Sequence, residues 1–100
     1  MIAKTKHYSV VILRHGPNWG KPESEKTIWE HGTRNFELRR DGLLPIVCPV
    51  ADGSEVSGVG IFNASIDGVK RIMDADQGVK EGVFVYEVHD CRSYPCDCLP

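Results

Sequence analysis

The order of apolar patterns along the chain constrains the fold more than any single motif does. A β-branched and aromatic run from His7 to Leu13 predicts a first strand. Residues 43–50 and 55–63 predict two further strands joined by a tight turn at Ala51–Ser54, whose Asp-Gly pair is typical of hairpins. A fourth strand is predicted over residues 82–89. The chain therefore holds four strand-like segments, two of them paired locally.

Two helical patterns separate these strands. The first follows the Gly- and Pro-rich loop of residues 14–25, with Ser24 as a plausible N-cap, and ends near Asp41-Gly42. The second is expected to begin after Ser65. One stripe at helical spacing is formed by Ile28, His31, Asn35 and Leu38 in the first segment, and apolar residues at helical spacing in the second are Ile66, Val69, Ile72 and Met73.

The resulting order, β-α-β-β-α-β, predicts an α+β fold of the ferredoxin-like sandwich type, with both helices on one face of an antiparallel sheet. At 100 residues the chain is expected to form one domain. The first and last predicted strands offer apolar side chains to both sheet faces. Because two helices cover only one face, the other is expected to pack against a second subunit in a homodimer.

This topology predicts which loops meet at one end of the sheet. If the first strand runs upward, Arg14, His31, Asp52 and Asp76 all lie at the top. A carboxylate on one imidazole nitrogen fixes the histidine tautomer and stabilises the imidazolium, so His31 with Asp76 is a candidate proton-transfer pair. The alternative is structural: His31 is then a histidine at the core edge and Asp76 caps a turn before the last strand.

Two further residues of the first loop are candidates for ligand contact. Arg14 offers a charge and Trp19 an aromatic face, which suit an anionic or aromatic ligand. The alternatives are a surface arginine and a tryptophan that seals the loop. His15 is expected to point to the sheet face opposite to Arg14, because neighbouring strand residues alternate.

Charge and hydropathy exclude several classes of partner. Twelve basic and fourteen acidic residues give a net charge of −2, and no basic stripe suited to nucleic acid is present. The arginines Arg34, Arg39 and Arg40 are interleaved with acidic residues and are interpreted as a solvated helix face. No segment has the pattern of a signal peptide or a membrane span, so a cytoplasmic location is expected.

The cysteines do not predict a disulfide framework. Cys48 stands alone, whereas Cys91, Cys96 and Cys98 cluster in the tail, where His89 completes an H-x-C-x4-C-x-C pattern. Reduced thiols are the simplest interpretation. A soft metal site in this tail is the open alternative, although the pattern lacks the two separated pairs of a typical structural zinc site.

The chain resembles the YCII-related proteins over nearly its whole length. The resemblance rests on WEHGTRNFELRRDGLL, on Cys48-Pro49 where the family usually has Gly-Pro, on VSGVGIF, and on ADQGVKEGVFVYEVH where it usually has Asp-Pro. It implies a dimeric α+β barrel and a His-Asp dyad at His31 and Asp76 in a ligand pocket. It also places Cys48 at this pocket, where a Gly would allow a ligand to approach closely.

The function expected from these features is proton transfer on a small anionic or aromatic metabolite, as in a lyase or dehydrohalogenation step. No nucleophilic triad is evident, which disfavours acyl transfer. No cofactor and no catalytic metal are implied. A non-catalytic small-molecule-binding or interaction module is the alternative, and loss of chemistry with retained binding would distinguish it.

Overall fold

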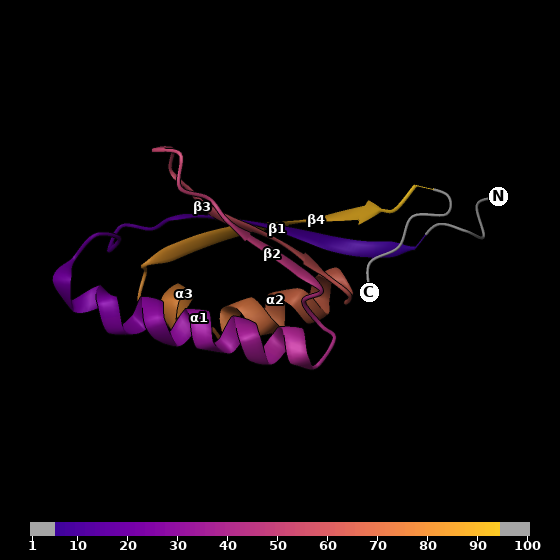
Figure 1. Ribbon diagram of the computed structural model, residues 1–100, viewed down its shortest axis with the longest axis horizontal. Coiled ribbons are helices and arrows are strands. Elements are labelled where there is room, and N and C mark those ends of the chain that lie inside the picture. Colours follow the sequence, from indigo (N-terminus) through magenta and orange to yellow (C-terminus); the bar gives the residue numbers. More distant parts are fainter. Residues whose placement is uncertain (1–5, 95–100) are drawn as a thin grey trace.

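The computed structural model describes residues 6–94, which form one four-stranded sheet with helices along one side (Figure 1). The elements in chain order are β1 (His7–His15), the 3-10 turn η2 (Pro22–Ser24), α1 (Glu25–Arg40), β2 (Ile46–Pro49), β3 (Val56–Phe62), α2 (Ile66–Asp74), α3 (Gln77–Lys80) and β4 (Phe84–Arg92).

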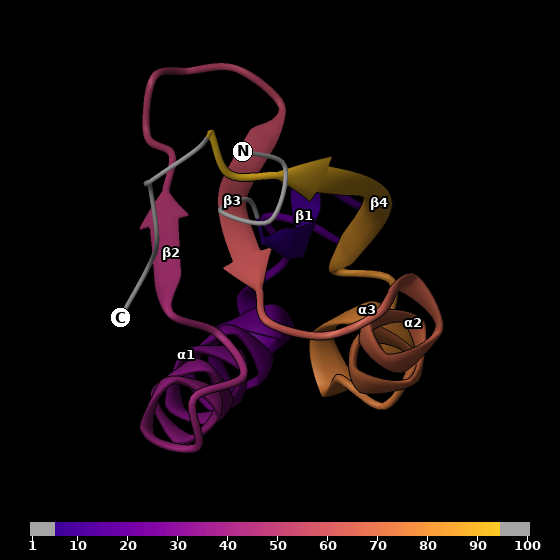
Figure 2. The ribbon, with the colours of Figure 1, turned by 90° about the vertical axis from the view of Figure 1, so that its right-hand side faces the viewer.

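The sheet has the strand order β2-β3-β1-β4, and every neighbouring pair is antiparallel. The end-on view shows α1 and the α2–α3 pair side by side beneath the sheet, and no helix of residues 6–94 lies on the opposite face, here called the bare face (Figure 2). This arrangement confirms the predicted α+β, ferredoxin-like fold, which is the protomer architecture of dimeric α+β barrels.

The hairpin and the second helix form as predicted, with one difference in length. The Ser65 hydroxyl caps α2 by accepting a bond from the Gly68 backbone N–H. The strand expected over residues 43–50 is shorter, because the N–H groups of Leu43 and Leu44 bond to the Leu38 carbonyl and close the end of α1. These two residues therefore terminate a helix instead of extending the sheet.

The start of α1 also differs from the prediction. Ser24 precedes the helix, but its backbone is already helical and its side chain makes no capping bond. The turn η2 brings it there, and its hydroxyl instead donates to the Asn18 carbonyl at 2.9 Å. Ser24 thus ties the long first loop to the beginning of the helix.

The core lies between the helices and the sheet, whereas no helix of residues 6–94 covers the opposite face. The buried apolar residues of this core cluster are Val11, Leu13, Leu44, Phe62, Val69, Met73, Val83 and Phe84, and Tyr8 is buried outside the cluster. On the opposite face, Ile46 and Val85 keep 41% and 46% of their surface exposed. Within residues 6–94, no helix is both long and apolar enough to cross a membrane.

Candidate active site

His31 and Asp76, 45 residues apart in sequence, meet between α1 and the start of α3. Nδ1 of His31 lies 3.0 Å from Oδ2 of Asp76. His31 belongs to the face of α1 that turns toward the sheet, and Asp76 occupies the residue just before α3. The structure therefore brings together the two side chains that the sequence singled out.

Asp76 is 2% exposed, and its partners His31 and Arg34 compensate for the water that its carboxylate loses on burial. Burial by itself raises the pKa of the carboxyl, but the bond and charge of His31, the charge of Arg34 and a bond from the Val79 backbone N–H outweigh it, so the pKa is lowered. Nη1 of Arg34 lies 3.5 Å from Oδ1. Asp76 is therefore ionised at neutral pH.

The ionised carboxylate determines where neutral His31 carries its proton. A carboxylate can only accept a hydrogen bond, so Nδ1 must be the donor and Nε2 keeps its lone pair. The amide nitrogen of Asn35 lies 3.4 Å from Nε2, as expected for a donor facing that lone pair. The His31 ring is further held by Phe84, with ring centroids 4.7 Å apart.

A cavity of about 250 Å³ opens beside this histidine, between α1 and the sheet. Its walls are mostly apolar, and His31 and Asn35 bring polar groups to them. Gly58 and Gly60 on β3 leave part of the sheet surface without side chains. Among residues 6–94, no Lys, Arg, Asp or Glu lines the cavity. A ligand here would meet apolar surface, the imidazole of His31 and the amide of Asn35.

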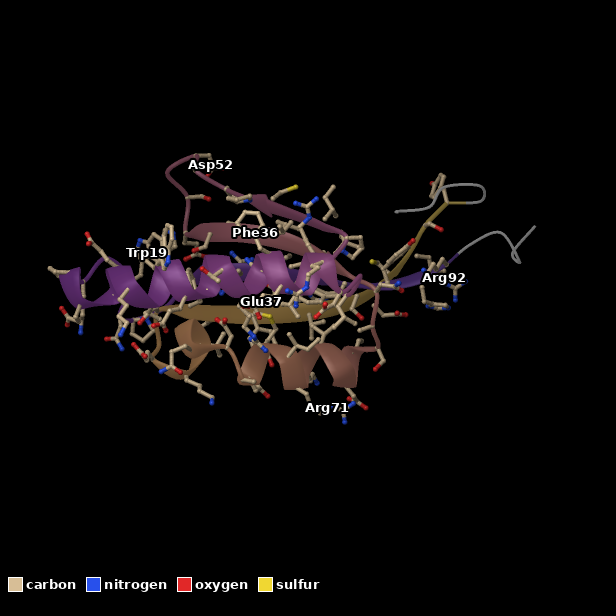
Figure 3. The ribbon with its side chains drawn as sticks, turned by 60° about the horizontal axis from the view of Figure 1, so that its bottom comes forward. Trp19, Phe36, Glu37, Asp52, Arg71 and Arg92 are labelled. Carbon is tan, nitrogen blue, oxygen red and sulfur yellow. The ribbon has the colours of Figure 1, made fainter. Side chains whose placement is uncertain are left out.

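Trp19 lines one side of the cavity and stacks on His15. Figure 3 shows Trp19 beside the N-terminal half of α1. The His15 ring stacks on Trp19 with a centroid distance of 4.0 Å and an interplanar angle of 5°. The ring centroid of Trp19 in turn lies 5.6 Å from the ring centroid of Phe84. His15 therefore takes the helix-covered side of the sheet, where Arg14 was expected.

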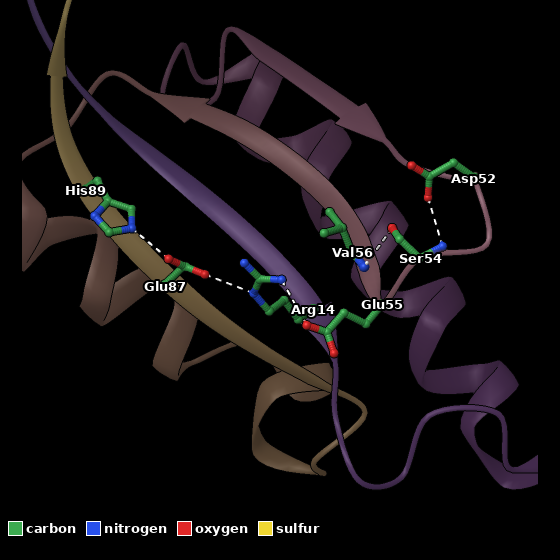
Figure 4. Close-up of polar contacts among 7 residues, drawn as sticks. All are labelled: Arg14, Asp52, Ser54, Glu55, Val56, Glu87 and His89. Atoms are coloured by element: carbon green, nitrogen blue, oxygen red, sulfur yellow. Dashed lines mark hydrogen bonds and ion pairs between the residues drawn. The ribbon is translucent and has the colours of Figure 1, made fainter.

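Arg14 points to the opposite face of the sheet. Its Nε donates to Glu87 at 2.9 Å and its Nη1 to Glu55 at 3.1 Å, and Glu87 also pairs with His89 (Figure 4). Hydrogen bonding by Glu87 raises the pKa of the Arg14 guanidinium. The structure thus does not bring Arg14 to the cavity. The alternation with His15 was read correctly, but the side assigned to each residue was wrong.

Cys48 and Asp52 also lie outside the cavity. Cys48 alternates along β2 with Val47 and Pro49, which line the cavity, so its side chain projects from the other face, where it is exposed. Asp52 accepts a bond from the Ser54 backbone N–H at the hairpin tip (Figure 4). This bond stabilises the turn. The Ser54 side chain, and after it this backbone bond, lower the pKa of the Asp52 carboxyl.

Two residues of the site were missed from the sequence. Asn35 shared the predicted stripe with His31, but no role was assigned to it. Arg34 was interpreted as part of a solvated face, and for this residue that interpretation is wrong, because it reaches Asp76. The available signal was spacing, since residues three and four positions after His31 lie on the same side of the helix.

The cysteine tail is only partly described. Cys91 is a free thiol, and burial, together with Asp90, raises its pKa. Cys96 and Cys98 lie outside the described residues, so the tail pattern stays a prediction. Within residues 6–94, no group of three His, Cys, Asp or Glu side chains could hold a metal ion.

Comparison with known proteins supports the fold. No family model and no curated protein matches the chain. A solved structure of 5-chloro-2-hydroxyhydroquinone dehydrochlorinase (TftG) from Burkholderia phenoliruptrix AC1100, in complex with 2,5-dihydroxybenzoquinone, is similar with a TM-score of 0.51. The match has 17% sequence identity and covers 81% of this chain and 90% of the other. At this identity the similarity shows the shared fold alone.

Proposed function

We propose that this protein is a YCII-like small-molecule enzyme in which His31, held by Asp76, transfers a proton to or from a ligand in the cavity. The observation that carries the proposal is the 3.0 Å contact between Nδ1 and Oδ2 beside a mostly apolar cavity. Histidine is suited to accept and return protons near neutral pH. The cytoplasm is the location proposed for this activity.

The proposed step uses Nε2 as the base. The ligand displaces the Asn35 amide from Nε2, Nε2 takes a proton from the ligand, and Asp76 stabilises the imidazolium that forms. In an elimination, the electron pair left behind forms a new double bond, and a leaving group such as halide departs as an anion. The imidazolium then returns its proton to water. A fold shared with a dehydrochlorinase is consistent with this class of reaction.

The cavity favours a small aromatic ligand. An apolar cavity of roughly 150 Å³ holds benzene. At about 250 Å³, the cavity here has room for one substituted ring. Trp19 and Phe84 offer aromatic faces, while the imidazolium formed during proton transfer would balance the negative charge that develops on the ligand.

Replacement of His31 tests the proposal against the binding-module alternative. Mass spectrometry of the native protein identifies a co-purified ligand, and its halogenated or hydroxylated aromatic analogues form the substrate screen. His31→Ala should lower turnover by about 100-fold or more while ligand affinity changes little. His7→Ala is the control, because His7 is exposed and does not line the cavity.

Turnover that persists in His31→Ala would rule out the dyad mechanism. A wild-type protein that binds the ligand without converting it, and whose affinity changes in His31→Ala, would identify a binding module.

We also propose that the bare sheet face forms a homodimer. Ile61 lies on this face between Val10 and Ile46, and the apolar patch they belong to would remain in water in a monomer. Sedimentation at micromolar concentration should show a dimer, and Ile61→Glu should give a monomer. Trp29→Glu should stay dimeric, because Trp29 is exposed on α1. A monomeric wild-type protein would contradict this proposal.

A further inference from the structure

Each oxygen of the buried Asp76 carboxylate faces a different side chain of α1. Oδ2 meets Nδ1 of His31 at 3.0 Å, and Oδ1 meets Nη1 of Arg34 at 3.5 Å. The two α1 residues are three positions apart, which places them on neighbouring parts of one helix face. The Asp76 side chain is 3% exposed and that of Arg34 is 30% exposed. Arg34 thus reaches from the surface to a carboxylate that water barely contacts.

We propose that Arg34 is a positioning residue of the site, which keeps Asp76 ionised and turned so that Oδ2 faces Nδ1 of His31. This inference rests on the proposed function only in taking His31 as the proton-transfer group. Arg34 does not line the cavity, so it would act through Asp76 and not on the ligand.

The need for such a residue follows from the burial of Asp76. A buried carboxylate favours its protonated form unless nearby positive charge compensates for the lost water. Besides His31 and Arg34, the backbone N–H of Val79 also bonds to this carboxylate. Without Arg34 the carboxylate would lose its side-chain contact at Oδ1 and could turn, and His31 would then lose the acceptor that keeps its proton on Nδ1. The charge of Arg34 is among the causes that lower the pKa of Asp76.

Other charged groups on α1, at the end of α2 and around α3 do not pair with Asp76. Glu30 on α1 pairs with Lys26 at 3.9 Å, and Asp74 at the end of α2 accepts from Tyr86. Lys80 on α3 makes no ion pair with Asp76, and Glu81 accepts bonds from Thr27 and Gln77. On β4, the aromatic ring of Phe84 is what packs on His31.

Arg34 is therefore the one cation besides His31, among residues 6–94, that forms an ion pair with Asp76. The role proposed for it depends on its charge at this position.

Three variants separate this role from a general effect of removing an arginine. Arg34→Gln removes the charge, Arg34→Lys keeps it, and Arg39→Gln removes a charge from an exposed position of the same helix. Carbon-13 NMR of the Asp76 carboxyl gives its pKa. Nitrogen-15 NMR at about pH 8, above the ordinary titration range of imidazole, gives the His31 tautomer.

We expect Arg34→Gln to raise the Asp76 pKa by about one unit and to lower the fraction of His31 with its proton on Nδ1. Arg34→Lys should retain most of both properties, and Arg39→Gln should match the wild type. An Asp76 pKa unchanged in Arg34→Gln, or raised equally in Arg39→Gln, would overturn the proposal. Neither readout needs a substrate, so a protein without turnover would refute the proposed function and leave this result standing.

Discussion

Each face of the sheet is associated with an ion-paired carboxylate, and the two pairs differ mainly in their surroundings. On the helix side, the Asp76 side chain is 3% exposed between His31 and Arg34. On the bare side, the Glu87 side chain is 39% exposed between Arg14 and His89. The partners are of the same types, an arginine and a histidine. Of these two carboxylates, Asp76 is the one whose histidine partner lines the cavity described above.

This comparison shows that a shifted pKa does not identify the site. The pKa of Glu87 is lowered, first by hydrogen bonding to His89 and then to Arg14, and the pKa of Asp76 is lowered as well. For Asp76, however, burial opposes the shift and the partners must overcome it. Water screens the exposed pair, whereas the buried pair can hold an imidazole in one tautomer.

The two carboxylates should differ most in how much their replacement lowers the free energy of unfolding. Asp76→Asn should lower the free energy of unfolding by about 2–3 kcal/mol, because it weakens charge-assisted bonds to two partners. Glu87→Gln should leave the urea midpoint nearly unchanged, because water replaces its lost contacts. Both are measured by urea unfolding in an Ile61→Glu background, which is designed to keep the bare face in water. Equal losses in the two variants would remove the distinction drawn here.

The sequence predicted the elements better than it predicted which side chains share a face. Hydropathy periods and the Asp-Gly turn are local signals, and they identified the four strands and the two main helices. Residue alternation predicted correctly that Arg14 and His15 diverge. It could not show which of them points toward the helices, because that depends on long-range packing of α1 against the sheet.

The same dependence on long-range packing explains why the predictions for Cys48 and Arg34 were wrong. Cys48 was placed at the ligand pocket by resemblance to a family, yet the pleat of β2 turns it to the bare face. Arg34 looked solvated because acidic residues surround it in sequence. Its contact with Asp76 depends on α3, a four-residue helix too short to leave a periodic pattern.

A smaller effect on stability is expected from tighter packing at Gly78, next to Asp76 and Phe84. A Cβ added at Gly78 would lie 2.6 Å from Cδ2 of Phe84 and 3.1 Å from Oδ2 of Asp76. Gly78→Ala should therefore cost about 1–2 kcal/mol of stability and disturb the His31 contact. At Gly32, a Cβ would meet nothing within 4 Å, so Gly32→Ala is the matched control. A Gly78→Ala protein as stable as wild type would show that the side chains around Gly78 are loosely packed.

The smallest expected effect is the dependence of stability on pH. A carboxyl whose pKa is lowered on folding stabilises the native state above its unfolded pKa of about 4, and this stabilisation is lost as pH falls through the folded pKa. The gap in thermal midpoint between wild type and Asp76→Asn should therefore narrow below about pH 4. A gap that stays constant from pH 7 to pH 3 would argue against an ionised Asp76.

The tautomer of His31 tests the central claim most directly. Nitrogen-15 NMR of the imidazole at about pH 8 should show the wild-type proton on Nδ1, with the lone pair of Nε2 facing the Asn35 amide at the cavity wall. In Asp76→Asn, the proton should be redistributed toward Nε2, because the carboxylate acceptor is gone. A wild-type His31 that carries its proton on Nε2, or a tautomer that does not change in Asp76→Asn, would contradict the account.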